Sequence, residues 1–168
     1  MKKVAFSLLF LILIASNCWS ADGPYIGAGA TLTRLEVDDF NDVENGYKLF
    51  GGWRLSENFA IEGSWQDPGE FKENDVKLDI DGYTAEVLGI TPDLDGIKFF
   101  GKIGYYDFSA DNKVSGEDTK EDGMLLGVGL MGELEKNLAV RVEFNWFDSD
   151  DLAISGALTI EWYFIGPN

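Results

Sequence analysis

The feature of this sequence that most constrains its fold is an alternation of apolar and polar residues that recurs along most of the chain. In residues 138–146, one face would carry Leu138, Val140, Val142, Phe144 and Trp146, and the other Ala139, Arg141, Glu143 and Asn145. Residues 59–66 repeat this pattern. A period of two is typical of a β-strand with one apolar face, so the sequence predicts an all-β fold.

Extending this pattern along the chain predicts eight strands, at about residues 24–34, 46–54, 58–66, 81–90, 97–107, 123–134, 138–147 and 152–164. Short connections are expected at Leu55–Glu57, Thr91–Gly96 and Glu135–Asn137, and longer ones at the opposite end of the strands, except for a short and very acidic connection at Asp148–Asp151. Outer-membrane barrels have this asymmetry, with short periplasmic turns and longer outer loops. The fold class predicted is therefore an eight-stranded antiparallel up-and-down transmembrane β-barrel.

Aromatic residues on the apolar faces support a membrane location, because they are predicted to lie at two heights. The group expected near the outer loops is Tyr47, Trp65, Tyr83, Tyr105 and Trp146, and the group near the turns is Trp53, Phe59, Phe99, Trp162 and Phe164. Such rings prefer the two membrane interfaces. In a soluble exported lipid-binding barrel, the alternative, the same rings would fill the core and the charged face would meet solvent.

Residues 1–20 have the three parts of a secretory signal peptide: Lys2 and Lys3, an apolar run, and an end with small residues. The apolar run of about 12 residues is too short to span a hydrocarbon layer of ~30 Å as a helix. We expect cleavage after Ser20, which leaves residues 21–168 as the barrel domain. Lipidation of Cys18 is the alternative for this segment.

The charge of the chain limits its partners. There are 13 Lys and Arg residues against 30 Asp and Glu, which gives a net charge of −17. A protein that neutralises nucleic-acid phosphates needs a basic surface, so no nucleic-acid partner is expected. The excess of carboxylates favours divalent cations or a cationic surface partner, and it also serves solubility.

The chain resembles a known family, the small barrels of the outer membrane protein A and outer membrane protein X type. The stretches that carry the resemblance are 25–30 (YIGAGA), 47–53 (YKLFGGW), 59–63 (FAIEG), 139–144 (AVRVEF) and 160–164 (IEWYF). Ile165–Asn168 follow Phe164, where family members usually end on the aromatic residue. The resemblance implies the outer membrane of a Gram-negative bacterium, in contact with its lipid and lipopolysaccharide.

The polar faces of the strands, which would point into the lumen, carry nearly balanced charges. The predicted lumen charge network is Lys48, Arg54, Lys98, Lys102 and Arg141 against Glu62, Glu86, Glu143 and Glu161. Charges withdrawn from water must be paired, and a barrel of eight strands is filled by its side chains. We therefore expect a charge-paired, largely plugged lumen. In outer membrane protein A a central salt-bridge cluster acts as a gate, and the resemblance extends to Glu62 and Arg141, with Glu86 and Met131 at its other two positions.

The remaining candidate site lies in the acidic outer connections. Carboxylate oxygens suit Ca²⁺ and Mg²⁺, and the predicted cation ligands are Asp38, Asp39, Asp42, Asp118, Glu121 and Asp122.

The chain has no histidine, and its one cysteine is Cys18, so we expect neither an enzyme nor a bound cofactor. The function predicted is a structural or surface-interaction role, and the alternative is a low-conductance channel for ions or small solutes.

Overall fold

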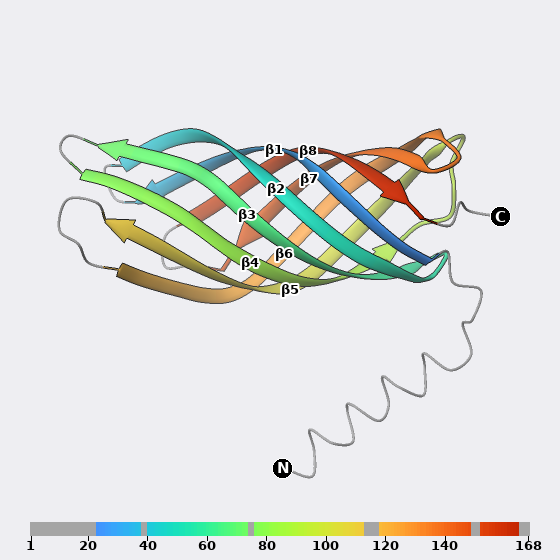
Figure 1. Cartoon of the computed structure of the whole chain (residues 1–168), viewed down its shortest axis with the longest axis horizontal. Helices are drawn as coiled ribbons and strands as arrows, with labels where there is room; N and C mark the ends of the chain where they lie inside the picture. The colour runs from blue at the N-terminus through green and yellow to red at the C-terminus, as the bar shows by residue number, and fades with distance from the viewer. Residues whose placement is uncertain (1–22, 38–39, 74–75, 113–117, 149–151, 165–168) are drawn as a thin grey trace, which may run out of the picture.

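A computed structural model of the chain describes residues 23–37, 40–73, 76–112, 118–148 and 152–164. These residues form eight strands: β1 (Gly23–Val37), β2 (Phe40–Ser56), β3 (Phe59–Glu73), β4 (Val76–Ile90), β5 (Ile97–Asn112), β6 (Asp118–Glu135), β7 (Leu138–Phe147) and β8 (Leu152–Tyr163). Each strand pairs antiparallel with the next, and β8 pairs with β1 to close the barrel (Figure 1). The predicted eight-stranded up-and-down barrel is confirmed.

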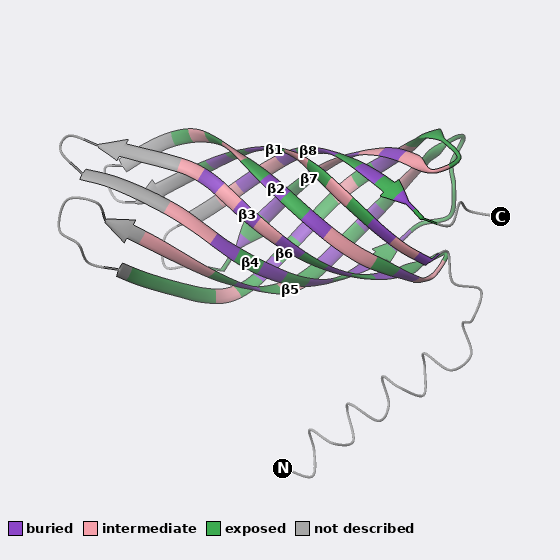
Figure 2. Ribbon diagram, in the orientation of Figure 1, coloured by how far each residue is buried: buried purple, intermediate pink, exposed green. Residues whose placement is uncertain are grey.

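The two faces of the wall differ as the alternation predicts. Figure 2 shows buried and exposed residues following one another along each strand. The predicted aromatic girdles lie on the outer face, where Tyr83 is 66% exposed and Phe59 is 55% exposed. Trp65 is half-buried and packs edge to face against Tyr47, with ring centroids 5.4 Å apart. No helix among the described residues is long and apolar enough to cross a membrane.

The turns at one end of the barrel are short, as expected, and hydrogen bonds of their polar side chains fix them. Asn58 Nδ2 donates to Ile90 O at 2.9 Å, and Asp93 Oδ1 accepts from the Gly96 N–H at 2.7 Å. Asn137 Nδ2 donates to Tyr163 O at 3.1 Å. Asn and Asp suit such positions because their side chains bond to nearby backbone groups.

At the other end of the barrel, the prediction of long loops was wrong for three of the four connections. β1 continues to Val37 before β2 begins at Phe40, β3 continues to Glu73 before β4 begins at Val76, and β5 continues to Asn112 before β6 begins at Asp118. The apolar and polar alternation ends earlier than the strands do, because residues beyond the membrane need no apolar outer face. Backbone pairing does not depend on that alternation, so the ladders continue.

The inside of the barrel holds two apolar clusters, one toward each end. The turn-end cluster consists of Tyr25, Phe50, Ala60, Leu88, Ile90, Phe100, Met131, Ala139 and Tyr163. Near the opposite end, Tyr106, Leu125 and Phe147 form the second cluster, which we call the aromatic cluster and against which Phe108 packs. Most of the buried charged side chains lie between these clusters, and Arg54 reaches into the first of them, where it contacts Tyr163.

Candidate functional site

The interior charges come from six strands and meet at the middle of the barrel. Eight of them are at most 4% exposed: Lys48, Arg54, Lys102 and Arg141 with Glu62, Glu86, Glu143 and Glu161. The charges of these eight residues, the central network, sum to zero. This balance matters because an uncompensated charge in such a place costs several kcal/mol.

The two lysines of the central network bridge glutamates on different strands. Lys48 Nζ lies 2.8 Å from Glu143 Oε1, 3.3 Å from Glu62 Oε1 and 3.9 Å from Glu86 Oε1. Lys102 Nζ lies 2.8 Å from Glu86 Oε2 and 3.2 Å from Glu143 Oε2. Each lysine thus holds together carboxylates that alone would repel one another.

Arg141 is the most highly connected member of the central network. Its Nη1 lies 2.7 Å from Glu62 Oε2 and 3.0 Å from Glu161 Oε2, and its Nη2 lies 2.9 Å from Glu143 Oε2. The guanidinium also lies 4.8 Å from the ring centroids of both Phe50 and Phe100. The guanidinium therefore gains charge-assisted hydrogen bonds in its plane and cation–π contacts with the rings of the turn-end cluster.

Arg54 and Glu161 continue the central network toward the turn end. Arg54 Nη2 lies 3.8 Å from Glu161 Oε1 and donates to the Tyr163 hydroxyl at 2.6 Å. The Tyr25 hydroxyl donates to Glu62 Oε2 at 3.1 Å. The polar atoms of these two tyrosines are thus joined to the charges, while their rings pack in the apolar cluster.

Lys98 does not belong to the central network, which corrects its predicted place. It is the second residue of β5, so it lies at the rim of the barrel, and its Nζ pairs with Glu133 Oε1 at 2.8 Å. The Glu133 side chain is 38% exposed. Sequence reasoning missed Glu133, although it shares the inward face of its strand with Met131.

Inward glycines make room for the long charged side chains, and sequence reasoning missed them as well. Gly127 faces Lys102 across the β5–β6 ladder, and a Cβ on Gly127 would lie 2.6 Å from Lys102 Cε. A Cβ on Gly104 would lie 2.8 Å from Glu86 Cγ. Only the registers of neighbouring strands reveal this pairing of a small residue with a large one.

A layer of hydroxyl and amide groups covers the central network on the side of the outer end. Ser64 and Thr84 share a hydrogen bond of 2.6 Å, and Thr84 Oγ1 donates to Glu86 Oε1 at 2.6 Å. On the opposite wall, Thr33 Oγ1 donates to Ser155 Oγ at 3.2 Å. The aromatic cluster lies beyond this layer, so the described interior passes from apolar through charged and polar to aromatic.

The predicted cation ligands are not brought together among the described residues. Asp38 and Asp39 lie outside these residues, and the structure describes only the backbone of Asp42, in β2, and of Asp118, in β6. Glu121 and Asp122 are exposed residues of β6 and not of a loop. Within the described part, no group of three acidic side chains has the arrangement needed to hold a metal ion.

Comparisons with known proteins agree with this architecture. The family model described as "Outer membrane protein beta-barrel domain" matches residues 4–160. No curated protein matches the chain. Among solved structures, Neisserial surface protein A is 14% identical, with coverage of 86% of this chain and 99% of that one and a TM-score of 0.69.

Two further structures are similar in the same way. The attachment invasion locus protein Ail of Yersinia pestis, solved in complex with the heparin analogue sucrose octasulfate, is 16% identical, with coverage of 84% and 99% and a TM-score of 0.63. The outer membrane protein OprG of Pseudomonas aeruginosa is 9% identical, with coverage of 84% and 96% and a TM-score of 0.60. At these identities the similarity establishes a shared fold.

Proposed function

Because the chain belongs to the outer membrane protein beta-barrel domain family, we propose that it is a structural barrel whose external end takes part in surface interactions and whose lumen is plugged. Its location is the outer membrane of a Gram-negative bacterium. The single observation that carries the proposal is the central network. Its eight charged residues are at most 4% exposed, and ion pairs at 2.7–3.9 Å connect opposite walls of the barrel.

The energetics of this arrangement favour a plug over a pore. An ion that crossed the lumen would have to separate Arg141 or Lys48 from carboxylates that are their buried partners. Separating a buried pair leaves charges without compensation, which costs several kcal/mol. The cluster near the turns adds a second obstacle, because its side chains are mainly apolar and the hydroxyls of Tyr25 and Tyr163 are already engaged with Glu62 and Arg54.

Conductance in planar bilayers tests the plugged lumen. We expect the refolded parent barrel to show no steady conductance under conditions in which an open porin conducts. A variant that carries both Arg141→Ser and Phe100→Ser removes two plugging side chains and should conduct. Steady ohmic conductance of the parent would support the low-conductance channel instead, and a closed variant would show that these two side chains do not form the barrier.

The external partners follow from charge. Ail was solved with a sulfated polyanion, but this chain carries a net charge of −17. We therefore propose cationic partners, divalent cations and lipopolysaccharide-associated ions among them.

Ca²⁺ titration followed by NMR should shift signals of the parent more than those of a variant with Asp38, Asp39 and Asp42 changed to Asn. The matched control changes Glu57, Asp95 and Glu135, at the turn end, to their amides. An equal loss of the Ca²⁺-induced signal shifts in both variants would refute a localised outer site.

Two further parts of the proposal concern processing and chemistry. Residues 1–20 are proposed to be removed as a signal peptide, and the intact mass of the protein from outer membranes should correspond to a chain that begins at Ala21. A mass that includes residues 1–20 or a lipid on Cys18 would refute this.

The barrel is proposed to be without enzymatic activity, since the chain has no histidine to act as a general base.

A further inference from the structure

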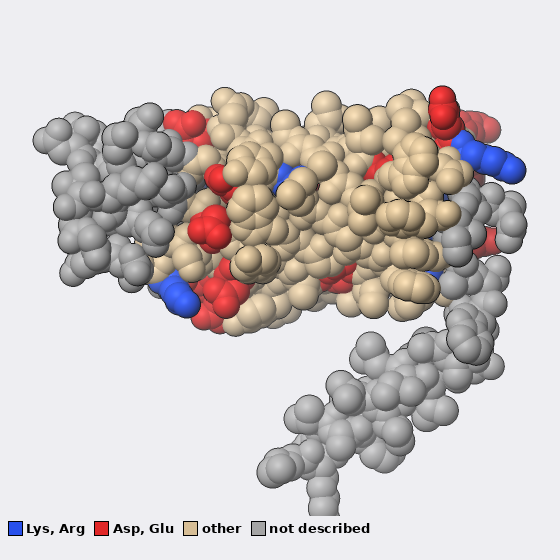
Figure 3. Space-filling model, in the orientation of Figure 1, with Lys and Arg blue, Asp and Glu red and all other residues tan. Residues whose placement is uncertain are grey.

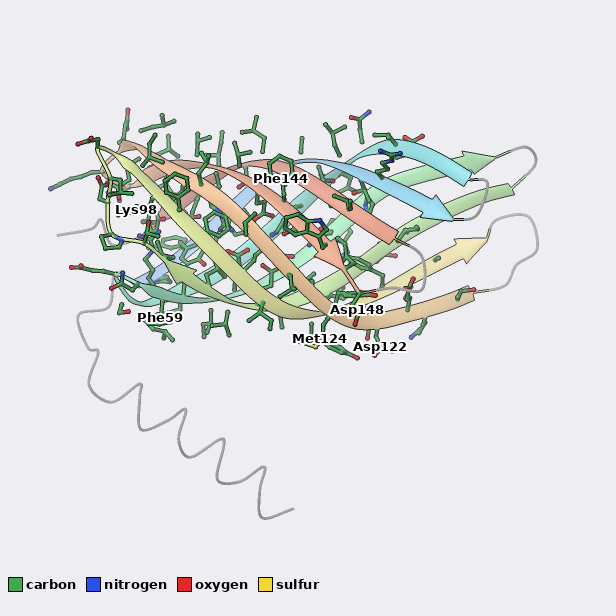
Figure 4. All side chains as sticks on the ribbon, turned by 180° about the vertical axis from the view of Figure 1, so that it is seen from behind. Phe59, Lys98, Asp122, Met124, Phe144 and Asp148 are labelled. Carbon is green, nitrogen blue, oxygen red and sulfur yellow. The ribbon has the colours of Figure 1, made fainter. Side chains whose placement is uncertain are left out.

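The outer ends of β6 and β7 do not coincide. The β6–β7 ladder ends at the pair Leu125–Phe147, and one further backbone bond joins the Asp148 N–H to Met124 O at 2.8 Å. β6 extends further out and remains paired with β5 as far as Asp118. Figure 4 shows Asp148 at the end of β7 beside Asp122 and Met124, with the β5–β6 hairpin continuing past them.

Among the described residues, this difference in length leaves backbone groups of β6 without a strand partner, and we call this stretch the open edge. Along a strand, successive residues direct their N–H and C=O groups to opposite sides. Met124 O accepts a bond from the β7 side, so Asp122 and Lys120 direct their backbone groups to that side as well. Within the described part of the chain, no strand pairs with these two residues there. Such an edge is a template for pairing with another strand.

The open edge is held in place by the aromatic cluster beneath it. The Tyr106 and Phe147 rings pack at 90° with centroids 5.3 Å apart, and the Tyr106 hydroxyl donates to Asp148 O at 3.0 Å. Phe108 packs against Phe147, with centroids 5.4 Å apart. A partner strand would thus meet an edge whose backbone is already ordered, which reduces the entropy lost on binding.

The side chains around the open edge indicate the charge of the partner. Glu121, Asp122 and Asp148 are exposed there, and Lys120 is the exposed basic residue beside them. Asp122 also accepts a hydrogen bond from the Tyr105 hydroxyl, which keeps its carboxylate on the outer face. Pairing between two copies of this edge would place like charges together, which disfavours self-association. A strand with basic side chains would complement the edge.

We infer that the β6 edge at Lys120–Asp122 binds an extended cationic peptide segment, which adds to the barrel as a strand. This inference rests on the proposed surface-interaction role and specifies the chemistry of its partner. Backbone hydrogen bonds from Lys120 and Asp122 supply the pairing, and the acidic side chains select basic residues in the peptide.

The probe for this inference is an end-blocked peptide of four Lys-Val repeats, added to the refolded barrel in nanodiscs. The amide signals of Lys120 and Asp122 should shift, and their hydrogen exchange should slow when the peptide is bound. The same peptide with Glu in place of Lys should leave these amides unchanged. Raising the salt concentration should weaken binding of the Lys-Val peptide, since the selecting carboxylates are exposed.

A pair of variants at one position separates the backbone contribution from charge. Lys120→Pro removes an N–H that faces the open edge and not β5, and binding should weaken about tenfold. Lys120→Ala keeps that N–H and removes a positive charge, so it should bind as tightly as the parent or more tightly. Heat-dependent migration in SDS gels establishes that each variant is folded.

Three results would overturn the inference: equal binding of the Glu-Val peptide, exchange at Lys120 and Asp122 that stays fast in the parent with peptide present, or a folded Lys120→Pro barrel that binds like the parent. The exchange measurement on the parent decides the matter even if Lys120→Pro does not fold. If the peptide does not bind and the parent barrel does not conduct, only the peptide site is refuted. Conductance of the parent would refute the plugged lumen, whatever the result with the peptide.

Discussion

The section of the barrel between the two aromatic girdles and the section beyond the outer girdle use charged residues in opposite ways. Between the girdles, charges lie inside the wall, are balanced and are paired, as Arg141 and its three glutamates illustrate. Beyond the outer girdle, charges lie on the exposed surface, are mostly acidic, and include Asp107 directly opposite Asp122. Figure 3 shows acidic side chains gathered where the apolar band ends toward the outer end.

Strands such as β5 and β6 pass through both sections, so the difference comes from the surroundings and not from secondary structure. Lipid excludes charge from the outer face between the girdles, and the closed interior tolerates charge only in pairs. Water removes both restrictions beyond the outer girdle. Substitutions in the first section should therefore have large effects on stability, and those in the second should have small effects that depend on salt.

The largest effect is expected for Arg141→Met. This substitution leaves Glu62, Glu143 and Glu161 without their shared partner in the lumen. The free energy of unfolding should fall by ~3–5 kcal/mol, as found when one member of a buried pair is removed. Denaturant titration of the barrel folded into lipid vesicles measures this loss.

Two comparisons check the cause of that loss. Lys98→Met, at the exposed rim pair with Glu133, should cost at most about 1 kcal/mol. Combining Glu62→Gln with Arg141→Met should cost less than the two single losses together, because they share one interaction. Strictly additive losses would contradict the pairing of Glu62 with Arg141.

The next largest effect is expected on the lipid face. Val142 lies on the outer face of β7 between the girdles, and Val142→Arg should weaken folding into bilayers by ~2–4 kcal/mol. Val43 is an exposed valine of β2 beyond the Tyr47 girdle position, so Val43→Arg should cost no more than ~1 kcal/mol. Equal costs for the two valines would place the membrane boundary elsewhere.

An intermediate effect is expected for Gly127→Ala, because the added Cβ would lie 2.6 Å from Lys102 Cε and 2.6 Å from Asn145 Oδ1. Overpacking of this kind costs roughly 1–3 kcal/mol. Gly89 has no heavy atom within 4 Å of an added Cβ, so Gly89→Ala is the matched control and should not destabilise the barrel. A similar loss in both variants would point to backbone effects common to both glycines.

The fold was predictable because lipid and lumen impose a period of two on every strand that crosses the membrane. That signal identified which residues face outward, such as Val142, and which face inward, such as Glu143. It could not fix the outer ends of the strands, because residues 67–73 lose the alternation while β3 continues to Glu73. Those ends depend on backbone pairing, which the side-chain pattern does not record.

Inward positions along the sequence name the eight residues of the central network together with Lys98, but they do not indicate which of these residues contact one another. Inward positions identified Lys48 and Glu143, yet their separation of 2.8 Å joins β2 to β7 across the lumen, which no alternation along one strand can indicate. Lys98 was predicted to join the central network because its position in the strand faces inward. It lies instead at the rim of the barrel, at a different height along the barrel axis. The height of a residue along the barrel axis depends on the stagger between strands, and this stagger is known only when the registers of all eight strands are known.

The smallest effect is expected at the outer surface, for Asp107→Asn. Asp107 and Asp122 are paired directly across the β5–β6 ladder, and both are exposed. Like charges directly opposite one another destabilise a sheet, so removing one should raise the free energy of unfolding by about 0.2–1 kcal/mol at low salt. Asp122 remains able to accept the Tyr105 hydroxyl, so the substitution removes the repulsion without removing that bond.

Salt distinguishes this gain from any change in packing. At 1 M salt the screening length is ~3 Å, so the repulsion between two exposed carboxylates is largely removed in the parent as well, and the advantage of Asp107→Asn should disappear. Denaturant titrations at about 10 mM and 1 M salt, with exposed Glu57→Gln at the turn end as the control, measure the difference. A gain that persists at 1 M salt would mean that Asn stabilises the strand by some other route. A loss at low salt would mean that Asp107 has a stabilising partner that outweighs its repulsion from Asp122.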